Sequence, residues 1–155
     1  MKERQPRLIH QRQGVVEHLV GLGGEAGDQV GAEGDIRADE MFENTLSLVE
    51  KAGLSFLHVF PFSPRPGTPA ARMPQLERGV VKARAERLRG AGEAALTRHL
   101  DRQVGRTVPA LVEREGLARA EDFTEIAFDG SAEAGSIAPL RITGHDGKRA
   151  RAQSL

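Results

Sequence analysis

Hydrophobic and polar positions first become regularly periodic at Asp39. From there to Gly53, apolar side chains recur at helical spacing, at Phe42, Leu46, Val49 and Ala52. Asp39 has the chemistry of an N-cap, and Lys51 followed by Gly53 is typical of a helix end. The pattern predicts a short amphipathic helix that begins at Asp39.

Directly after this helix, residues 54–60 read LSFLHVF and are apolar at both odd and even positions. Continuous apolarity between Gly53 and Pro61 is typical of a strand buried on both faces, as in a parallel sheet covered by helices. We therefore predict an α/β unit. His58 lies within the predicted strand, where we expect a packed, hydrogen-bonded side chain rather than a metal ligand.

A proline-rich loop at residues 61–74 leads into a second, longer helix. Five prolines restrict the backbone of that loop. Leu76 to about Arg102 then carries one broad apolar face, with Gly90 and Gly92 as weak points. Basic residues outnumber acidic ones on this helix, which favours a solvated face and leaves recognition of a partner as the alternative.

After Gly105 the apolar period changes from that of a helix to that of strands. Four short strands are predicted, at residues 107–113, 123–128, 136–143 and 148–153, and Asp146-Gly147 is a strong hairpin signal between the last two. So few strands avoid open edges only by closing into a barrel, of the oligonucleotide-binding kind. The predicted fold class is α+β, with a partial α/β unit followed by a small antiparallel β-barrel.

Residues 1–38 show no sustained period. The stretch from Gly21 to Ala26 fits a relaxed dinucleotide-binding pattern, but it lacks the strand, turn and helix that would present a helix N-terminus to a pyrophosphate. We predict a flexible segment here.

Composition narrows the possible chemistry. The chain has no cysteine, so it offers no thiolate nucleophile or thiolate metal ligand. His99 and His145 have no partners at metal-binding spacing. The 22 basic and 22 acidic residues balance, which predicts modest affinity for polyanions. No signal-peptide or membrane-spanning run is present, and we expect a cytoplasmic protein without membrane contacts.

The segment DEMFENTLSLVEKAGLSFLHVFPFSPRPGTPAARMPQ, Asp39 to Gln75, resembles the last helix and strand of the radical-SAM barrel in the tRNA methylthiotransferases. It is most similar to the bacterial branch that modifies threonylcarbamoyladenosine next to the anticodon. Residues 104–155, with VGRTVPALVE and PLRITGHDGKR, resemble the TRAM domain of the same family. This resemblance divides the chain into a non-homologous segment 1–38, a barrel remnant with its long helix at 39–103, and a TRAM-like barrel at 104–155.

The resemblance implies radical chemistry with S-adenosylmethionine and two cysteine-held four-iron four-sulfur clusters, for which this chain has no ligands. The family's Gly-Phe-Pro-x-Glu-Thr stretch should precede Asp39, but the chain reads Gly34-Asp-Ile-Arg-Ala38. We therefore expect a C-terminal fragment preceded by an unrelated reading of coding sequence, as after a frameshift. A genuine short protein with a divergent N-terminus is the alternative.

Two groups of candidate site residues follow from the resemblance. Ser63, Arg65, Gly67 and Thr68 would lie near the nucleoside and S-adenosylmethionine in a complete enzyme, or would merely form a turn. Arg141, Lys148, Arg149 and Arg151 would contact RNA phosphates, or would be ordinary solvated charge partly opposed by acidic residues between 121 and 129. No catalytic residue is assigned.

The expected function is therefore weak tRNA binding without catalysis by this chain alone. The alternative is a non-catalytic protein-interaction module that docks on another chain, for example the missing N-terminal part of the enzyme.

Overall fold

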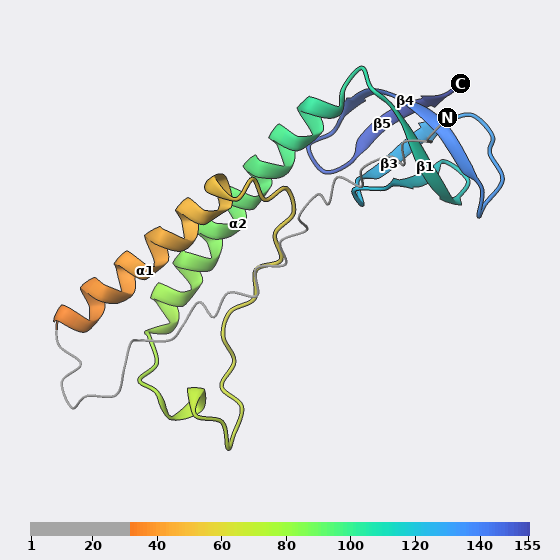
Figure 1. Cartoon of the computed structure of the whole chain (residues 1–155). Coiled ribbons are helices and arrows are strands. Elements are labelled where there is room, and N and C mark those ends of the chain that lie inside the picture. Colours follow the sequence, from red (N-terminus) through yellow and green to blue (C-terminus); the bar gives the residue numbers. More distant parts are fainter. Residues whose placement is uncertain (1–31) are drawn as a thin grey trace, which may run out of the picture.

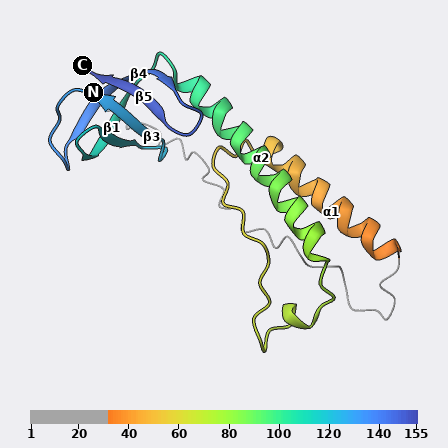
Figure 2. The same cartoon turned by 180° about the vertical axis from the view of Figure 1, so that it is seen from behind.

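A computed structural model describes residues 32–155 and shows two long helices followed by a small β-barrel (Figure 1). The helical elements are α1 (Ala32–Lys51), the short 3-10 helix η1 (Ala70–Arg72) and α2 (Arg78–Gln103). The strands are β1 (Thr107–Arg114), β2 (Leu117–Ala120), β3 (Glu125–Asp129), β4 (Ile137–His145) and β5 (Ala150–Ser154). The helices lie side by side, and the last turns of α2 reach the barrel (Figures 1 and 2).

Helices α1 and α2 run in the same direction and are held by paired charges around one aromatic ring. Arg84 Nη2 lies 2.6 Å from Asp39 Oδ1, and one turn further along both helices Arg87 Nη2 lies 2.7 Å from Glu43 Oε1. Both guanidinium groups lie over the ring of Phe42, at 5.4 and 5.0 Å from its centroid. Arg84 and Arg87, two of the basic residues of α2, thus bind α1 through ion pairs and through the ring of Phe42.

α1 begins at Ala32, so the predicted N-cap at Asp39 is wrong. The apolar period that begins at Phe42 marks the face packed in the core between the helices and not the first residue of the helix. Ala38, in the second turn, is buried. The rest of the predicted segment 1–38, including the glycine pattern from Gly21 to Ala26, lies outside the described residues.

The predicted strand at residues 54–60 is not formed. This segment is extended and runs back along α2, where Leu54 is buried and Leu57 and Val59 join the core cluster between the two helices. No residue from 54 to 60 pairs with a strand in the described part of the chain. A parallel strand needs neighbouring strands on its edges, and here the segment has α2 against it instead.

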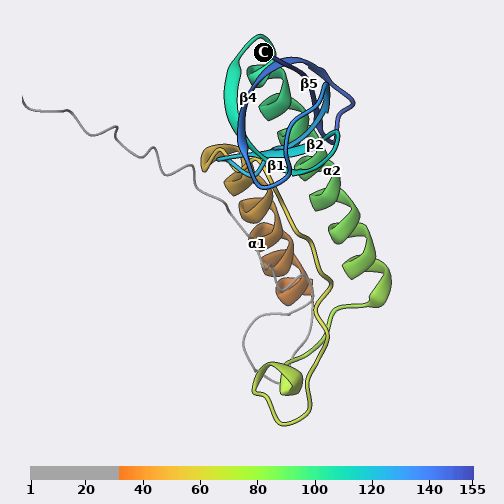
Figure 3. The same ribbon diagram turned by 90° about the vertical axis from the view of Figure 1, so that its right-hand side faces the viewer.

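The predicted barrel is confirmed, with one pairing that differs from expectation. Five strands close in the order β1-β2-β3-β5-β4 (Figure 3). All neighbours are antiparallel except β3 and β5, which are parallel. The strand β2 was absent from the sequence prediction, because its four residues, LARA, include only one large apolar side chain and carry little apolar signal. Inward-facing residues such as Ile126, Leu140 and Ile142 form the barrel core.

α2 is confirmed over nearly its predicted range, and its last turn enters the barrel core. Leu100 is 1% exposed and belongs to the same cluster as the inward-facing strand residues, with Leu96 packed against it. The end of the helix therefore closes one opening of the barrel. In residues 32–155 no helix is long and apolar enough to cross a membrane.

The two glycines within α2 differ in what surrounds them, which gives a matched stability prediction. A Cβ at Gly90 would meet nothing within 4 Å, whereas one at Gly92 would lie 3.1 Å from the Leu57 Cβ. We expect Gly90→Ala to raise the free energy of unfolding by about 1 kcal/mol through helix propensity. Gly92→Ala should give no gain, because Leu57 must move. Urea unfolding followed by circular dichroism measures both, and equal gains would contradict the close contact.

Candidate nucleic-acid interface

The four basic residues proposed to contact RNA all lie exposed on the last two strands of the barrel and the turn between them. Arg141 is on β4 and faces outward beside Gln153 of β5, and Arg151 lies two residues before Gln153 on the same outer face. Lys148 and Arg149 are in the turn. The structure therefore brings two strand cations and two turn cations together on β4, β5 and the turn that joins them.

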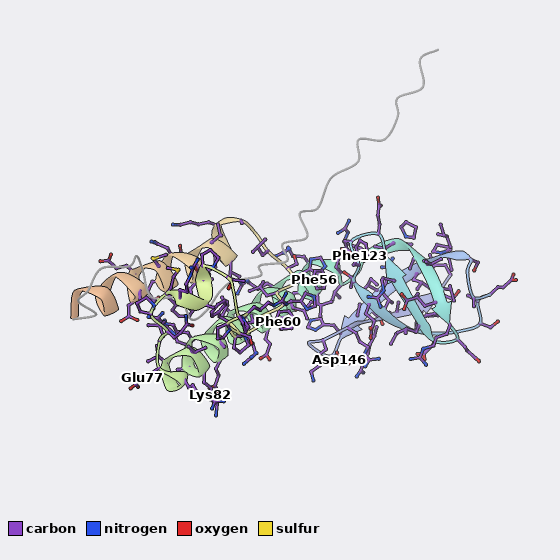
Figure 4. The ribbon with its side chains drawn as sticks, turned by 90° about the horizontal axis from the view of Figure 1, so that it is seen from below. Phe56, Phe60, Glu77, Lys82, Phe123 and Asp146 are labelled. Atoms are coloured by element: carbon purple, nitrogen blue, oxygen red, sulfur yellow. The ribbon has the colours of Figure 1, made fainter. Side chains whose placement is uncertain are left out.

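The turn itself is held by an aspartate. Asp146 Oδ1 accepts hydrogen bonds of 2.9 Å from the backbone N–H groups of Lys148 and Arg149. These two bonds, Arg149 first, hold the pKa of Asp146 below its usual value. Gly147 takes the positive φ of 87° that this turn requires. The predicted hairpin signal Asp146-Gly147 is thus confirmed, and Figure 4 shows Asp146 at the edge of the barrel.

Arg149 differs from the other three cations because it is held by carboxylates. Its guanidinium lies 3.5 Å from Glu125 Oε1 and 3.7 Å from Asp146 Oδ2. Glu125 also lies 3.6 Å from Arg119, which in turn contacts Glu113 at 2.6 Å. A chain of alternating charges, which we call the charged belt, therefore runs around the barrel through Glu113, Arg119, Glu125, Arg149 and Asp146.

Two features of the charged belt bear on RNA contact. The hydrogen bond from Arg119 holds the pKa of Glu113 below its usual value, so this carboxylate stays charged. Within residues 32–155, Arg141, Lys148 and Arg151 take part in no ion pair. From the sequence, Glu125 was only one of several acidic residues between 121 and 129 expected to oppose the positive charge of the four basic residues. Its specific pairing with Arg149 depends on the neighbouring β3 and β5, which no local signal predicts.

The second group of candidates lies in the loop between α1 and α2. Ser63, Arg65 and Gly67 are exposed, and Gly67 has a φ of 84°. The Thr68 hydroxyl donates to the Arg65 carbonyl oxygen at 2.8 Å and accepts from the Ala71 N–H at 3.2 Å. These contacts support the interpretation of Thr68 and Gly67 as turn-forming residues. Figures 1 and 2 show this loop at the end of α2 opposite the barrel.

Two of the three histidines singled out from the sequence are structural. His58 is exposed, so its predicted packing in a strand is wrong, since the strand itself is absent. His145 Nδ1 accepts from the Gly147 N–H at 3.1 Å, which leaves the proton on Nε2 to bind Asp101 Oδ1 at 2.9 Å. This contact ties the start of the hairpin turn to the last turn of α2.

His99 lies at the centre of a second, buried contact between α2 and the barrel, which we call the joint. Its side chain is 2% exposed, and Nε2 lies 2.9 Å from Thr124 Oγ1 and 3.3 Å from Asp122 Oδ2. Gln103 Nε2 donates to Asp122 Oδ2 at 2.8 Å. The ring of Phe56 packs edge-on against His99 with centroids 5.4 Å apart.

Asp122 is the electrostatic centre of the joint. Burial acts to raise its pKa, but hydrogen bonds with His99 and with the side chain and backbone of Thr124 outweigh burial and bring the pKa down to about 2. The carboxylate is therefore charged under all ordinary conditions. His99, Gln103, Asp122 and Thr124 tie the end of α2 to the segment before β3.

The described residues contain no ligand set for a metal. Between residues 32 and 155, no group of three histidine or acidic side chains is placed to hold an ion. The chain as a whole has no cysteine, and iron-sulfur clusters of the thiolate-bound kind do not fit it.

The chain is similar in sequence to several known methylthiotransferases. No family model matches the chain. It is 42% identical over 106 residues to the threonylcarbamoyladenosine tRNA methylthiotransferase MtaB of Rickettsia prowazekii, covering 68% of this chain and 25% of that protein. It is 41% identical over 121 residues to a tRNA-2-methylthio-N(6)-dimethylallyladenosine synthase of Salinispora arenicola, covering 71% of this chain and 24% of that protein.

A third relative has a different named substrate. The ribosomal protein uS12 methylthiotransferase RimO of a Nostoc species is 32% identical over 129 residues, covering 76% of this chain and 29% of that protein. The chain thus spans about a quarter of the length of these relatives, and two of the three named here act on tRNA while one acts on a ribosomal protein.

Proposed function

The chain is related to the C-terminal part of the methylthiotransferases, and on this premise we propose that it is a tRNA-binding element that performs no catalysis by itself. The observation that carries the proposal is the set of Arg141, Lys148 and Arg151, exposed on one side of a closed barrel and free of ion pairs within residues 32–155. A cation without a carboxylate partner can contact a phosphate without first losing an ion pair. A cytoplasmic location is in keeping with a tRNA ligand.

Catalysis would need groups that this chain does not have. Without cysteine it cannot hold a cluster, and cleavage of S-adenosylmethionine by this family depends on one. We propose that Ser63, Arg65, Gly67 and Thr68 act near substrate only when the rest of an enzyme is present. Ser63, Arg65 and Gly67 are exposed. This exposure supports the proposal that another chain or segment covers the loop and completes a site there.

A protein-interaction module is the second candidate function, and exposed apolar side chains favour it. Met41 and Leu48 on α1 are 57% and 49% exposed, and Phe60 in the adjoining segment is 63% exposed. Residues of this size gathered on a helical unit are typical of a surface that another polypeptide covers. The missing part of a methylthiotransferase barrel would be such a partner.

Charge reversal separates the two functions. We expect the parent chain to bind an anticodon stem-loop with a slope of log K against log salt near −2, from about 0.7 for each of three phosphate contacts. A fourfold rise in salt should then weaken binding roughly 20-fold. The triple variant Arg141→Glu, Lys148→Glu and Arg151→Glu should lose detectable binding in fluorescence anisotropy, with the circular dichroism spectrum unchanged.

A matched control is available in the first half of α2. Arg78, Lys82 and Arg89 are exposed basic residues outside the barrel, and Figure 4 shows Lys82 remote from it. Their replacement by glutamate should leave most of the affinity. If the barrel triple variant binds like the parent, the patch is ordinary solvated charge and the interaction module becomes the better proposal.

A further prediction follows from the charged belt. Glu125→Gln removes the carboxylate that lies 3.5 Å from Arg149, so this guanidinium group becomes more available to phosphate, whereas Arg119 stays bound to Glu113. We expect tighter RNA binding by a few-fold and a salt slope steeper by about 0.7. Glu115→Gln, at an exposed turn position of equal charge, is the control. Equal effects of the two substitutions would show that only net charge matters.

A further inference from the structure

One outer face of the barrel carries an apolar surface that the proposed function leaves without a role. Prolines 109 and 139 are opposite each other across β1 and β4, and Leu111 is opposite Ile137. All four side chains point out of the barrel, since they alternate along each strand with buried residues. Ile137 is 73% exposed and Leu111 47%. We call these four residues the apolar stripe.

Arginine side chains lie near the apolar stripe. Continuing along the same two strands, the next outward pair is Thr107 and Arg141. Arg141 is opposite Gln153 of β5, and Arg151 lies two residues before Gln153 on that strand. On the other side, Leu111 is opposite Arg119 of β2. The one carboxylate in the next outward position of β1, that of Glu113, is bound by Arg119. The stripe is therefore bordered on one side by Arg141, which takes part in no ion pair within residues 32–155, and on the other by the ion pair of Arg119 with Glu113.

We propose that the apolar stripe binds the faces of unpaired RNA bases while Arg141 and Arg151 hold the adjoining phosphates. This inference rests on the proposed RNA binding and specifies its form. Every base, whatever its sequence context, has an apolar face. Proline rings and aliphatic side chains offer a surface for that face, and the free energy gained is proportional to the apolar area removed from water. Bases in a duplex are stacked on each other and cannot reach such a surface, so the ligand is a single-stranded segment such as a loop.

Protein partners fit this face less well. Four side chains expose only roughly a few hundred Å², well below the 1,000 Å² or more that a stable protein interface buries. A protein would also have to place an acidic group against Arg141, which borders the stripe without an ion pair in residues 32–155. A nucleic acid supplies negative charge beside every base by its covalent structure.

The test separates base contact from phosphate contact by their different salt dependence. The double variant Leu111→Ser and Ile137→Ser should weaken binding of a fluorescein-labelled anticodon stem-loop about 10-fold, with the salt slope unchanged, because no phosphate contact is lost. Binding of a fully paired duplex of equal length should stay as in the parent. Arg141→Ala should instead reduce the slope by about 0.7 for both RNAs.

The control variant is Met41→Ser with Leu48→Ser, which removes two comparably exposed apolar side chains from α1 and should leave RNA binding unchanged. If the parent binds RNA and the stripe variant binds it equally well, or if loop and duplex are weakened alike, this inference is wrong while the proposed function stands. If the parent binds neither RNA at low salt, the proposed function fails. If the stripe variant changes only self-association in sedimentation, the stripe is a contact between copies of the chain, and base binding is overturned.

Discussion

Replacing Leu100 by alanine is expected to lower the free energy of unfolding of the barrel by about 3 to 5 kcal/mol. Leu100 is 1% exposed and belongs to the barrel core although it comes from α2. Truncation removes the transfer free energy of three carbons and leaves a cavity, because the closed strand order restricts collapse around it. A loss of this size is a large part of the total stability of a domain.

Urea unfolding should therefore show a lower midpoint with an unchanged slope, and amide exchange of β1 and β4 should accelerate together. Leu48→Ala is the matched control, because this leucine on α1 is 49% exposed and should cost well under about 1 kcal/mol. A loss below about 1 kcal/mol for Leu100→Ala would mean that the end of α2 rests on the barrel without contributing to its core.

Asp122→Asn should destabilise the joint by about 1 to 3 kcal/mol at neutral pH. Asp122 Oδ2 accepts from Gln103 Nε2 at 2.8 Å, and an asparagine amide at that position would face the glutamine amide donor to donor. Gln103 cannot turn without loss, because its Oε1 already accepts from Arg106 at 2.8 Å. His99 would also lose the negative charge beside its buried ring.

The pH dependence of stability tests the same group. The pKa of Asp122 is lowered in the folded chain to about 2 from its ordinary value of 3.8, so the unfolded chain binds more protons in this range. The stabilisation is fully present above about pH 5 and is lost as the pH falls toward 2. The difference in stability between parent and Asp122→Asn should shrink over that window.

Asp129→Asn, an exposed carboxylate on β3, provides the comparison for general charge effects at low pH. The parent and Asp129→Asn should lose stability together between pH 5 and pH 2, whereas Asp122→Asn should lose less. A difference between parent and Asp122→Asn that stays constant across the window would rule out Asp122 as the source.

Local patterns predicted much of the fold, because the spacing of apolar residues along a helix or strand shows which of its faces is buried. The apolar face of α2, with Ala85, Leu88 and Leu100, is buried as predicted, and alternation in β1 and β4 marked the strands that form the barrel. The predicted strand from 54 to 60 failed for the converse reason. Apolar residues in this segment indicate that it is buried, but not by what. Here they pack against α2 and pair with no strand in the described part of the chain.

The exposure of the four basic residues was predictable from the sequence, but the ion pairs that some of them form were not. Arg141, Lys148, Arg149 and Arg151 are exposed, as a basic turn flanked by short strands suggests. That Arg149 is held by Glu125 depends on β5 pairing with β3 across more than twenty residues of sequence. The joint is equally non-local, because His99 and Asp122 meet only after the helix enters the barrel.

The position of β5 between β3 and β4 has a consequence for how the barrel closes during folding. β3 pairs with β5 through residues 126–129 and β4 pairs with it through residues 140–145. Until residues 150–154 are in place, both of these strands have an unsatisfied edge, and β1 to β4 form an open sheet with its apolar face in water. An intermediate that lacks β5 is therefore prone to aggregation. The docking of this one strand satisfies both edges at once.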